Sequence, residues 1–177
     1  MPGCGKSSVG RHLARQLGLP FVDSDAELER RFGCSIKDYF AAHGEAAFRD
    51  AEEATIGELC DGPAALIATG GGAVLREANR TALHRGCTVF YLRASPDELF
   101  RRLRHDRTRP LLQVADPLGR LRELYRDRDP LYRRTAHYVI EAARPSVPAL
   151  INMVKTQLEL AGLVSGLPGD VPPPAAA

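Results

Sequence analysis

Apolar residues along the chain follow two spacings, one typical of helices and one typical of buried strands. Val9, Leu13 and Leu17 recur every four residues, which predicts an early helix that Gly18 ends. Short continuous apolar runs, of which Thr88–Leu92 is the clearest, predict strands buried on both faces. The two patterns alternate along most of the chain.

The alternation predicts an α/β fold in which a parallel sheet lies between two layers of helices. The predicted strands cover residues 21–23, 64–68, 88–92 and 138–140. The predicted helices cover residues 6–17, 24–32, 35–43, 45–60, 77–85, 95–104, 117–126, 131–135 and 146–161. Two helix starts carry capping boxes, which pair Ser24 with Glu27 and Ser95 with Glu98. In such sheets, ligands bind beyond the carboxyl ends of the strands.

The length of 177 residues fits one domain, which we expect to span residues 1–161. After Gly162 the chain is rich in glycine, proline and alanine, so residues 162–177 are predicted to be a disordered tail. The chain has no apolar run of about 20 residues, so no membrane association is expected. The four cysteines are widely scattered, which is typical of reduced thiols in a cytoplasmic protein.

The positive charge is carried almost entirely by arginine, with 21 arginines against three lysines and a net charge of only +2. Arginine clusters occur at 101–109 and 120–134, and nucleic-acid binding is the first alternative that they suggest. Acidic residues are interleaved, however, and aromatic residues make up only 6% of the chain. Arginine also binds phosphate and carboxylate in a bidentate manner. We therefore expect a small anionic substrate and no nucleic acid.

The chain opens on Gly3, Cys4, Gly5, Lys6, Ser7 and Ser8, the second half of a phosphate-binding loop of the form GxxxxGK[ST]. Glycines let backbone N–H groups close around phosphate oxygens, and the helix that follows points its positive end at the same anion. The lysine reaches the outer phosphates and the first serine is placed to bind Mg²⁺. The plainer alternative is a small-residue turn before a helix.

The first glycine of this motif and the apolar strand that normally precedes it are absent from the sequence. That strand is central in a sheet of this kind, and its loss leaves backbone groups unpaired on both sides. We therefore expect that Met1 is an internal methionine of a longer natural protein. A chain that begins at Met1 is expected to be poorly stable or inactive.

Polar residues follow the predicted strands at their carboxyl ends. Asp23 and Asp25 flank the end of the first strand, so one carboxylate can face the phosphate loop and the other an acceptor pocket. The alternative is that both stabilise the dipole of the next helix. Gly70–Gly72 follow the second strand, and three glycines carry a large conformational entropy that suggests a close approach of backbone to ligand.

Three arginines are candidates for anion binding, and each has a plainer interpretation. Arg49 lies three residues before Glu52, which also fits a surface ion pair within a helix. Arg109 begins an RPLL segment that could be a mobile lid over about 105–116, or a solvated loop. Arg128 could bind substrate, or be an exposed residue of a helix start.

Six short motifs occur together in one order: GxGK[ST] from Gly3, DSD from Asp23, GExxFRxxE from Gly44, GGG from Gly70, RPLL from Arg109 and RxPLY from Arg128. In this order and spacing the chain resembles the shikimate kinases from Met1 to about Leu160. The resemblance implies a P-loop kinase fold with five parallel strands, of which this chain lacks the first. It also implies ATP-dependent phosphorylation of the 3-hydroxyl of shikimate, on the route to the aromatic amino acids, by a cytoplasmic monomer.

The resemblance assigns a role to each candidate residue. Those implied for ATP are Gly3, Cys4, Gly5, Lys6, Ser7, Ser8, Arg102, Arg109 and Arg144, with Arg102 and Arg144 beside the adenine. Those implied for Mg²⁺ are Ser7 and Asp23. Those implied for shikimate are Asp25, Arg49, Gly70, Gly71, Gly72 and Arg128. Lys6, Asp25 and Arg109 are the implied catalytic residues, with Asp25 as the base for the 3-hydroxyl or the group that orients it.

Two other functions stay open from the sequence. A related small-molecule kinase, such as a gluconate or nucleoside-monophosphate kinase, would share the phosphate loop. A non-catalytic relative that binds a partner is favoured only by the incomplete loop. Paired arginines with a carboxylate between them suit a cyclic hydroxy acid better than a nucleotide base.

Overall fold

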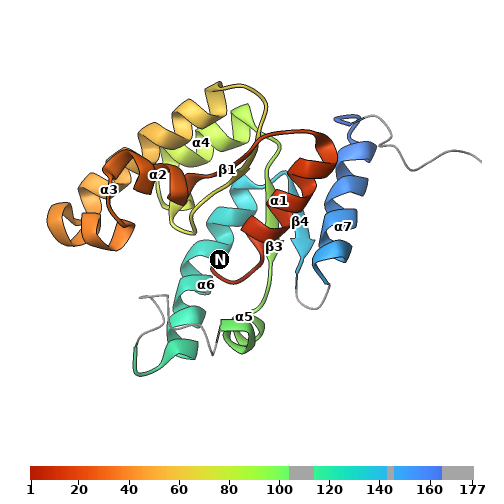
Figure 1. The fold of residues 1–177 in the computed structure, drawn as a ribbon. Coiled ribbons are helices and arrows are strands. Elements are labelled where there is room, and N and C mark those ends of the chain that lie inside the picture. Colours follow the sequence, from red (N-terminus) through yellow and green to blue (C-terminus); the bar gives the residue numbers. More distant parts are fainter. Residues whose placement is uncertain (104–113, 143–145, 165–177) are drawn as a thin grey trace, which may run out of the picture.

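The computed structural model describes residues 1–103, 114–142 and 146–164 (Figure 1). Its strands are β1 (Phe21–Asp23), β2 (Leu66–Ala68), β3 (Phe90–Arg93) and β4 (Tyr138–Glu141). Its helices are α1 (Lys6–Leu17), α2 (Ser24–Phe32), α3 (Ile36–Asp61), α4 (Glu77–Gly86), α5 (Pro96–Leu103), α6 (Pro117–Thr135) and α7 (Val147–Leu160), with a short 3₁₀ turn η1 (Ala73–Leu75). The α/β alternation and the parallel strands expected from the sequence are confirmed.

The strands form two parallel pairs instead of one continuous sheet. β1 pairs with β2, with Val22 opposite Ile67, and β3 pairs with β4, with Leu92 opposite Ile140. Among the described residues, no hydrogen-bonded ladder joins β2 to β3. The facing edges of β2 and β3 therefore lack strand partners within the described part of the chain.

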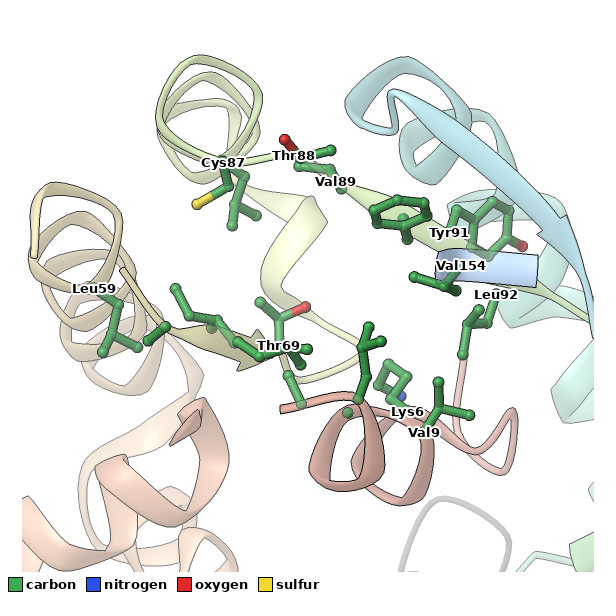
Figure 2. A pocket seen from close by; sticks show the side chains of 18 of the residues that line it. Lys6, Val9, Leu59, Thr69, Cys87, Thr88, Val89, Tyr91, Leu92 and Val154 are labelled. Carbon is green, nitrogen blue, oxygen red and sulfur yellow. The ribbon is translucent and has the colours of Figure 1, made fainter. Parts of the chain in front are cut away.

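A cavity of about 440 Å³ lies between these two edges. Figure 2 shows Thr69 on one side of it, Val89, Tyr91 and Leu92 on the other, and Val9 of α1 below. Leu66, Ile67 and Ala68 of β2 also line it, so most of its wall is apolar. A space of this size costs packing energy, because the surrounding side chains lose contacts on one side.

The largest core lies where α1, α5, α6 and α7 meet β3 and β4. α1 packs against α7, as their adjacent positions in Figure 1 show. Leu99, Leu121 and Ala142 of this core are fully buried. A second, smaller cluster contains Ile56 of α3 and Leu83 of α4. The apolar residues that recur at helical spacing in the sequence thus form the two cores. Helices α2 and α3 extend to one side of the larger core (Figure 1).

Helix α3 contains the break predicted at Gly44. Its φ and ψ of 80° and 174° are not helical, so two helical stretches meet there at a kink. Only glycine adopts such a conformation without strain, which explains the residue at this position.

The prediction of two separate helices at 117–126 and 131–135 was wrong. The structure has one helix, α6, that continues through Pro130. Proline normally costs a helix one hydrogen bond and a steric clash. Here the helix is held on both sides of Pro130 by buried side chains, Leu124 before it and Thr135 after it.

Capping at α2 also differs from the prediction. The Asp23 carboxylate caps this helix by accepting from the Asp25 backbone N–H at 3.1 Å, and Glu27 instead pairs with Arg30 and Arg31. The other predicted capping box is present, since Ser95 and Glu98 exchange hydrogen bonds of 3.4 Å. None of the helices formed by the described residues is both long enough and apolar enough to cross a lipid bilayer.

Candidate functional site

The N-terminal loop presents backbone N–H groups at the start of α1. Gly3 and Gly5 have positive φ values of 74° and 91°, and Gly5 is the N-cap of the helix. Gly5 has no side chain that could cap this helix start. The first N–H groups of α1 are therefore free to bind an anion, and the helix dipole adds favourable charge.

Lys6 and Ser7 lie on the same helix start with different partners. The Lys6 ammonium donates to the Met1 carbonyl at 2.9 Å, so it is folded back over the loop. The Ser7 hydroxyl donates to Oδ2 of Asp23 at 2.8 Å. Ser7 and Asp23 thus offer adjacent oxygen atoms beside the loop, a donor set that suits Mg²⁺ bound mainly through phosphates and water.

Asp25 is a largely buried carboxylate with a perturbed acidity. Burial raises the pKa of Asp25 to about 6, the carboxylates of Asp23 and Glu52 add to this increase, and Lys6 opposes it. The group is close to half ionised near pH 6, a range suited to accepting a proton at physiological pH. The contribution of Lys6 also shows that the phosphate loop lies within electrostatic reach of Asp25.

Asp25 packs against the turn at Gly70–Gly72, where each glycine faces a different side chain. A Cβ on Gly70 would collide with the Asp25 carboxylate, and a Cβ on Gly72 would lie 2.8 Å from Cζ of Arg49. None of the three glycines has a positive φ. Two of them are therefore glycines because charged side chains occupy the space of a Cβ.

Arg49 is held by carboxylates and aromatic rings. It donates to Glu52 at 2.7 Å and to Glu45 at 3.1 Å, and its guanidinium lies over the Phe48 ring at 5.2 Å. Side-chain exposure is 14% for Arg49 and 1% for Glu52. The interpretation of this pair as a surface ion pair is therefore wrong. A buried pair of this kind fixes the direction of the arginine, whereas a surface pair does not.

Arg128 and Tyr132 both reach the middle glycine from α6. The Arg128 guanidinium donates to the Gly71 carbonyl at 2.9 Å, and the Tyr132 hydroxyl donates to the same oxygen at 2.6 Å. Tyr132 in turn stacks on Tyr91 at 4.8 Å between ring centroids. The turn is thus tied to α6 from one side.

The three charged groups therefore meet along one turn. Asp25 contacts Gly70, Arg128 contacts Gly71 and Arg49 contacts Gly72. Since consecutive Cα atoms are about 3.8 Å apart and each group contacts its glycine, these groups lie within roughly 15 Å of one another. One carboxylate beside two guanidinium groups can hold a small hydroxylated acid, with the arginines on its carboxylate and the aspartate on a hydroxyl.

The remaining candidates lie beside the loop or outside the described residues. Arg102 donates to the Ala142 carbonyl at 2.5 Å and lies 3.5 Å from the Gly3 carbonyl, so it is placed between the loop and the end of β4. Arg109 and the core of the expected lid fall in 104–113, and Arg144 falls in 143–145. Both lie outside the described residues.

Sequence reasoning missed two residues that hold the turn. Ser24, interpreted as a helix cap, is fully buried, and its hydroxyl accepts from the Gly70 N–H at 3.1 Å. Tyr132 was noticed only as the end of the RxPLY motif. A signal for Ser24 was available, because it stands between two candidate carboxylates. Only the fold, however, brings it to Gly70, which is 46 residues away.

Comparisons with known proteins all identify the same family. The sequence model of a family described as shikimate kinase matches residues 2–159. A shikimate kinase of Paracidovorax citrulli is 59% identical over 166 residues, which cover 92% of this chain and 91% of that protein. Among solved structures, shikimate kinase from Acinetobacter baumannii in complex with shikimate is 42% identical with a TM-score of 0.84, covering 92% of this chain and 90% of that one. Shikimate kinase from Bacteroides thetaiotaomicron is 31% identical with a TM-score of 0.82, covering 89% and 94%.

Proposed function

The chain belongs to the shikimate kinase family, and we propose that Asp25, Arg49, Arg128 and the phosphate loop form its active site. As a member of this family it uses ATP to phosphorylate the 3-hydroxyl of shikimate, on the route to the aromatic amino acids. The observation that carries the residue assignment is the meeting of one carboxylate and two guanidinium groups on the Gly70–Gly72 turn.

On the nucleotide side, the loop N–H groups around Gly3 to Ser8 bind the phosphates, and Lys6 leaves the Met1 carbonyl to contact the outer ones. Cys4 lies within this loop with a buried side chain, so its backbone is the part that can face the nucleotide. Arg102 lies beside the adenine. Arg109 and Arg144 keep the roles implied by the resemblance, against the phosphates and the adenine respectively.

We propose that Ser7 and Asp23 hold Mg²⁺, with the Ser7 hydroxyl as a direct ligand and the Asp23 carboxylate fixing bound water. The hydrogen bond of 2.8 Å between their side chains supports this assignment, because it already brings two hard oxygen donors together. When bound, the metal offsets the charge of the transferring phosphoryl group.

On the acceptor side, Arg49 and Arg128 clamp the carboxylate of shikimate, and the N–H of Gly71 adds a donor. Gly70 and Gly72 shape the floor of the pocket. Asp25 accepts a hydrogen bond from the 3-hydroxyl and takes up its proton as the oxygen attacks the phosphoryl group. Its raised pKa supports the role of base, since the carboxylate is then a better proton acceptor near neutral pH.

A coupled assay for ADP release with shikimate, gluconate and nucleoside monophosphates tests this function. We expect release only with shikimate. A higher kcat/KM for gluconate or for a nucleotide would favour a different acceptor pocket. No turnover combined with normal ATP binding, both in the chain from Met1 and in a chain extended by an apolar strand before Met1, would favour the non-catalytic alternative.

The proposal also covers the domain boundaries, the oligomeric state and the cellular location of the protein. We propose that residues 1–161 form the catalytic domain and that about 105–116 act as its lid. The tail expected at 162–177 begins later than predicted, because the Leu163 N–H donates to the Leu158 carbonyl and Val164 packs against the core. We also propose a cytoplasmic monomer that binds neither nucleic acid nor membrane. Sedimentation velocity of the purified protein would reveal a dimer directly.

A further inference from the structure

Two cysteines from different helices lie with their sulfur atoms in contact, outside the proposed active site. Cys60 is near the end of α3, and Cys87 caps the end of α4 through its backbone N–H, which donates to the Leu83 carbonyl at 3.0 Å. Their Sγ atoms are 3.6 Å apart, with one S–H directed at the other sulfur. Sequence spacing gave no sign of this pair, because 26 residues separate the two cysteines.

The backbones at this point are also in contact. A Cβ on Gly86 would lie 3.1 Å from the Cys60 carbonyl oxygen and 3.2 Å from the Cys60 Cβ. The glycine therefore allows the end of α4 to rest directly on the end of α3. A disulfide needs closely spaced backbones and a sulfur–sulfur bond of about 2.05 Å, so the two sulfurs must close by about 1.5 Å. Small side-chain rotations supply a movement of that size.

From this geometry we propose that Cys60 and Cys87 are a modification site, which a peroxide oxidises to a disulfide and a dithiol reduces again. Both cysteines are only half-buried, so a small oxidant can reach them, and Figure 2 shows Cys87 on the wall of the cavity between β2 and β3. Cys34 is exposed, and the Cys4 thiol is buried and donates to the Met1 carbonyl. These two serve as internal comparisons.

The chemistry balances with hydrogen peroxide as the two-electron oxidant. The Cys87 thiolate attacks one peroxide oxygen, forming a sulfenic acid and releasing hydroxide, which becomes water. The Cys60 sulfur then attacks the Cys87 sulfur, the S–O bond breaks, and the second oxygen leaves as water with the Cys60 proton. In sum, two thiols and one peroxide give one disulfide and two waters.

The environment distinguishes the two thiols. Burial, followed by the neighbouring Cys87, raises the pKa of Cys60 to about 12. Burial thus disfavours the Cys60 thiolate, and we assign the first attack on the oxidant to Cys87, whose S–H is directed at the Cys60 sulfur. The disulfide should form faster as pH rises, because the first step consumes a thiolate and the second requires loss of the Cys60 proton.

The bond would close a loop that carries β2, the Gly70–Gly72 turn and α4. Closing a loop of this length restricts the unfolded chain, and we expect the oxidised protein to melt about 5 °C higher than the reduced one. Disulfides in cytoplasmic proteins are usually transient, which agrees with a bond that a dithiol reverses.

The test uses the full chain, treated with hydrogen peroxide and then with N-ethylmaleimide to block remaining thiols. Trypsin cleaves after Arg49, Arg76, Arg85 and Arg93, which places Cys60 in peptide 50–76 and Cys87 in peptide 86–93. We expect these two peptides to appear linked, about 2 Da lighter than their sum, and to separate after dithiothreitol. The melting temperature should rise with oxidation and fall again with reduction.

Substitutions of single cysteines test whether the disulfide joins Cys60 to Cys87. Cys34→Ser should retain both the linked peptides and the shift in melting temperature, whereas Cys60→Ser and Cys87→Ser should lose both. If a serine variant folds poorly, Cys60→Ala gives the same comparison without a buried hydroxyl. Recovery of maleimide on both Cys60 and Cys87 while Cys34 is oxidised would overturn the proposal. A melting shift that persists in Cys60→Ala would overturn it as well.

Discussion

The Arg49 guanidinium lies against Gly72, in the space that the Cβ of any other residue would occupy. The backbone of Gly72, at φ −93° and ψ −11°, is open to any residue, so the glycine is required by its neighbour and not by its own conformation. The same relationship holds between Asp25 and Gly70. Arg49 and Asp25 thus keep their positions because a glycine, far away in the sequence, leaves the space that they occupy.

This relationship makes Gly72→Ala a test of the acceptor pocket. The added methyl should displace Arg49 and raise the KM for shikimate at least tenfold, because a clamp on a carboxylate depends on position. Nucleotide affinity should stay unchanged, since the loop is untouched. Steady-state kinetics with each substrate varied in turn measures both values.

Gly57→Ala is the matched control for that substitution. Gly57 lies inside α3 with open space around its Cα, so alanine there should leave the KM unchanged and stabilise the helix by about 0.5–1 kcal/mol. Equal changes in shikimate KM for Gly57→Ala and Gly72→Ala would show that the effect does not come from Arg49.

Removal of Arg49 should affect both substrate binding and stability. Arg49→Ala should greatly weaken shikimate use with little change in nucleotide affinity. It should also destabilise the fold by roughly 3 kcal/mol, because Glu52 is left buried without its partner.

The double variant Arg49→Ala with Glu52→Gln separates these two effects. A neutral amide costs less to bury than a carboxylate, so denaturant unfolding should show part of the stability restored. Shikimate KM should stay as high as in the single variant. If the double variant also regained shikimate affinity, Arg49 would not be a substrate ligand.

Activity should depend on the ionisation of Asp25. With a pKa of about 6, the carboxylate is protonated at pH 5 and ionised above pH 7. The kcat/KM for shikimate should therefore rise about tenfold per pH unit below pH 6 and level off above pH 7. A profile that stayed flat between pH 5 and 7, with the protein folded throughout, would exclude Asp25 as the base.

Asp25→Asn should make the protein less active and more stable. We expect kcat to fall at least 100-fold, as is typical when a general base is lost. The raised pKa of Asp25 favours the folded state below about pH 4, and this advantage disappears as pH rises to 6. The variant should therefore gain up to about 3 kcal/mol over the parent at pH 7 and little at pH 4.

Thermal melts of both proteins at pH 4 and pH 7 measure this difference. Asp23→Ala is the comparison, since Asp23 caps α2 and the loss of its side-chain oxygen should lower the melting temperature. A constant offset between Asp25→Asn and the parent at both pH values would contradict the assigned cause.

The cavity between β2 and β3 should accept a designed strand. A segment of five valine and isoleucine residues joined to Met1 spans about 17 Å and can pair in parallel with both open edges. It would also replace the buried Met1 amino group, whose pKa is lowered to about 5 by burial and by Lys6. We expect a rise in melting temperature of 10 °C or more, on the order of that given by several kcal/mol of added burial.

A flexible extension of the same length, built of glycine and serine, is the control. It removes the buried amino group but offers no apolar side chains to the cavity. If both extensions raised the melting temperature equally, the gain would come from the terminus and not from filling the cavity.

Many of the elements could be predicted from the sequence because local interactions decide them. Helix α1 follows from a stripe of period 3.6 and a glycine end, and α5 from a capping box whose partners are three residues apart. The failure at Pro130 was not local in cause. The continuous helix through Pro130 depends on buried contacts on both sides of it, which outweigh the proline penalty in a way that no local pattern records.

The sequence by itself determined which residue types stand in which order, and thereby the phosphate loop, the alternating elements and the family. The tertiary structure alone decided that Asp25, Arg128 and Arg49 meet on three consecutive glycines. The physical reason is the distance along the chain over which each kind of interaction acts. Helix periodicity and caps act within one or two turns, whereas the contacts of the Gly70–Gly72 turn join residues 23 to 61 positions apart, and only packing of the whole core brings those together.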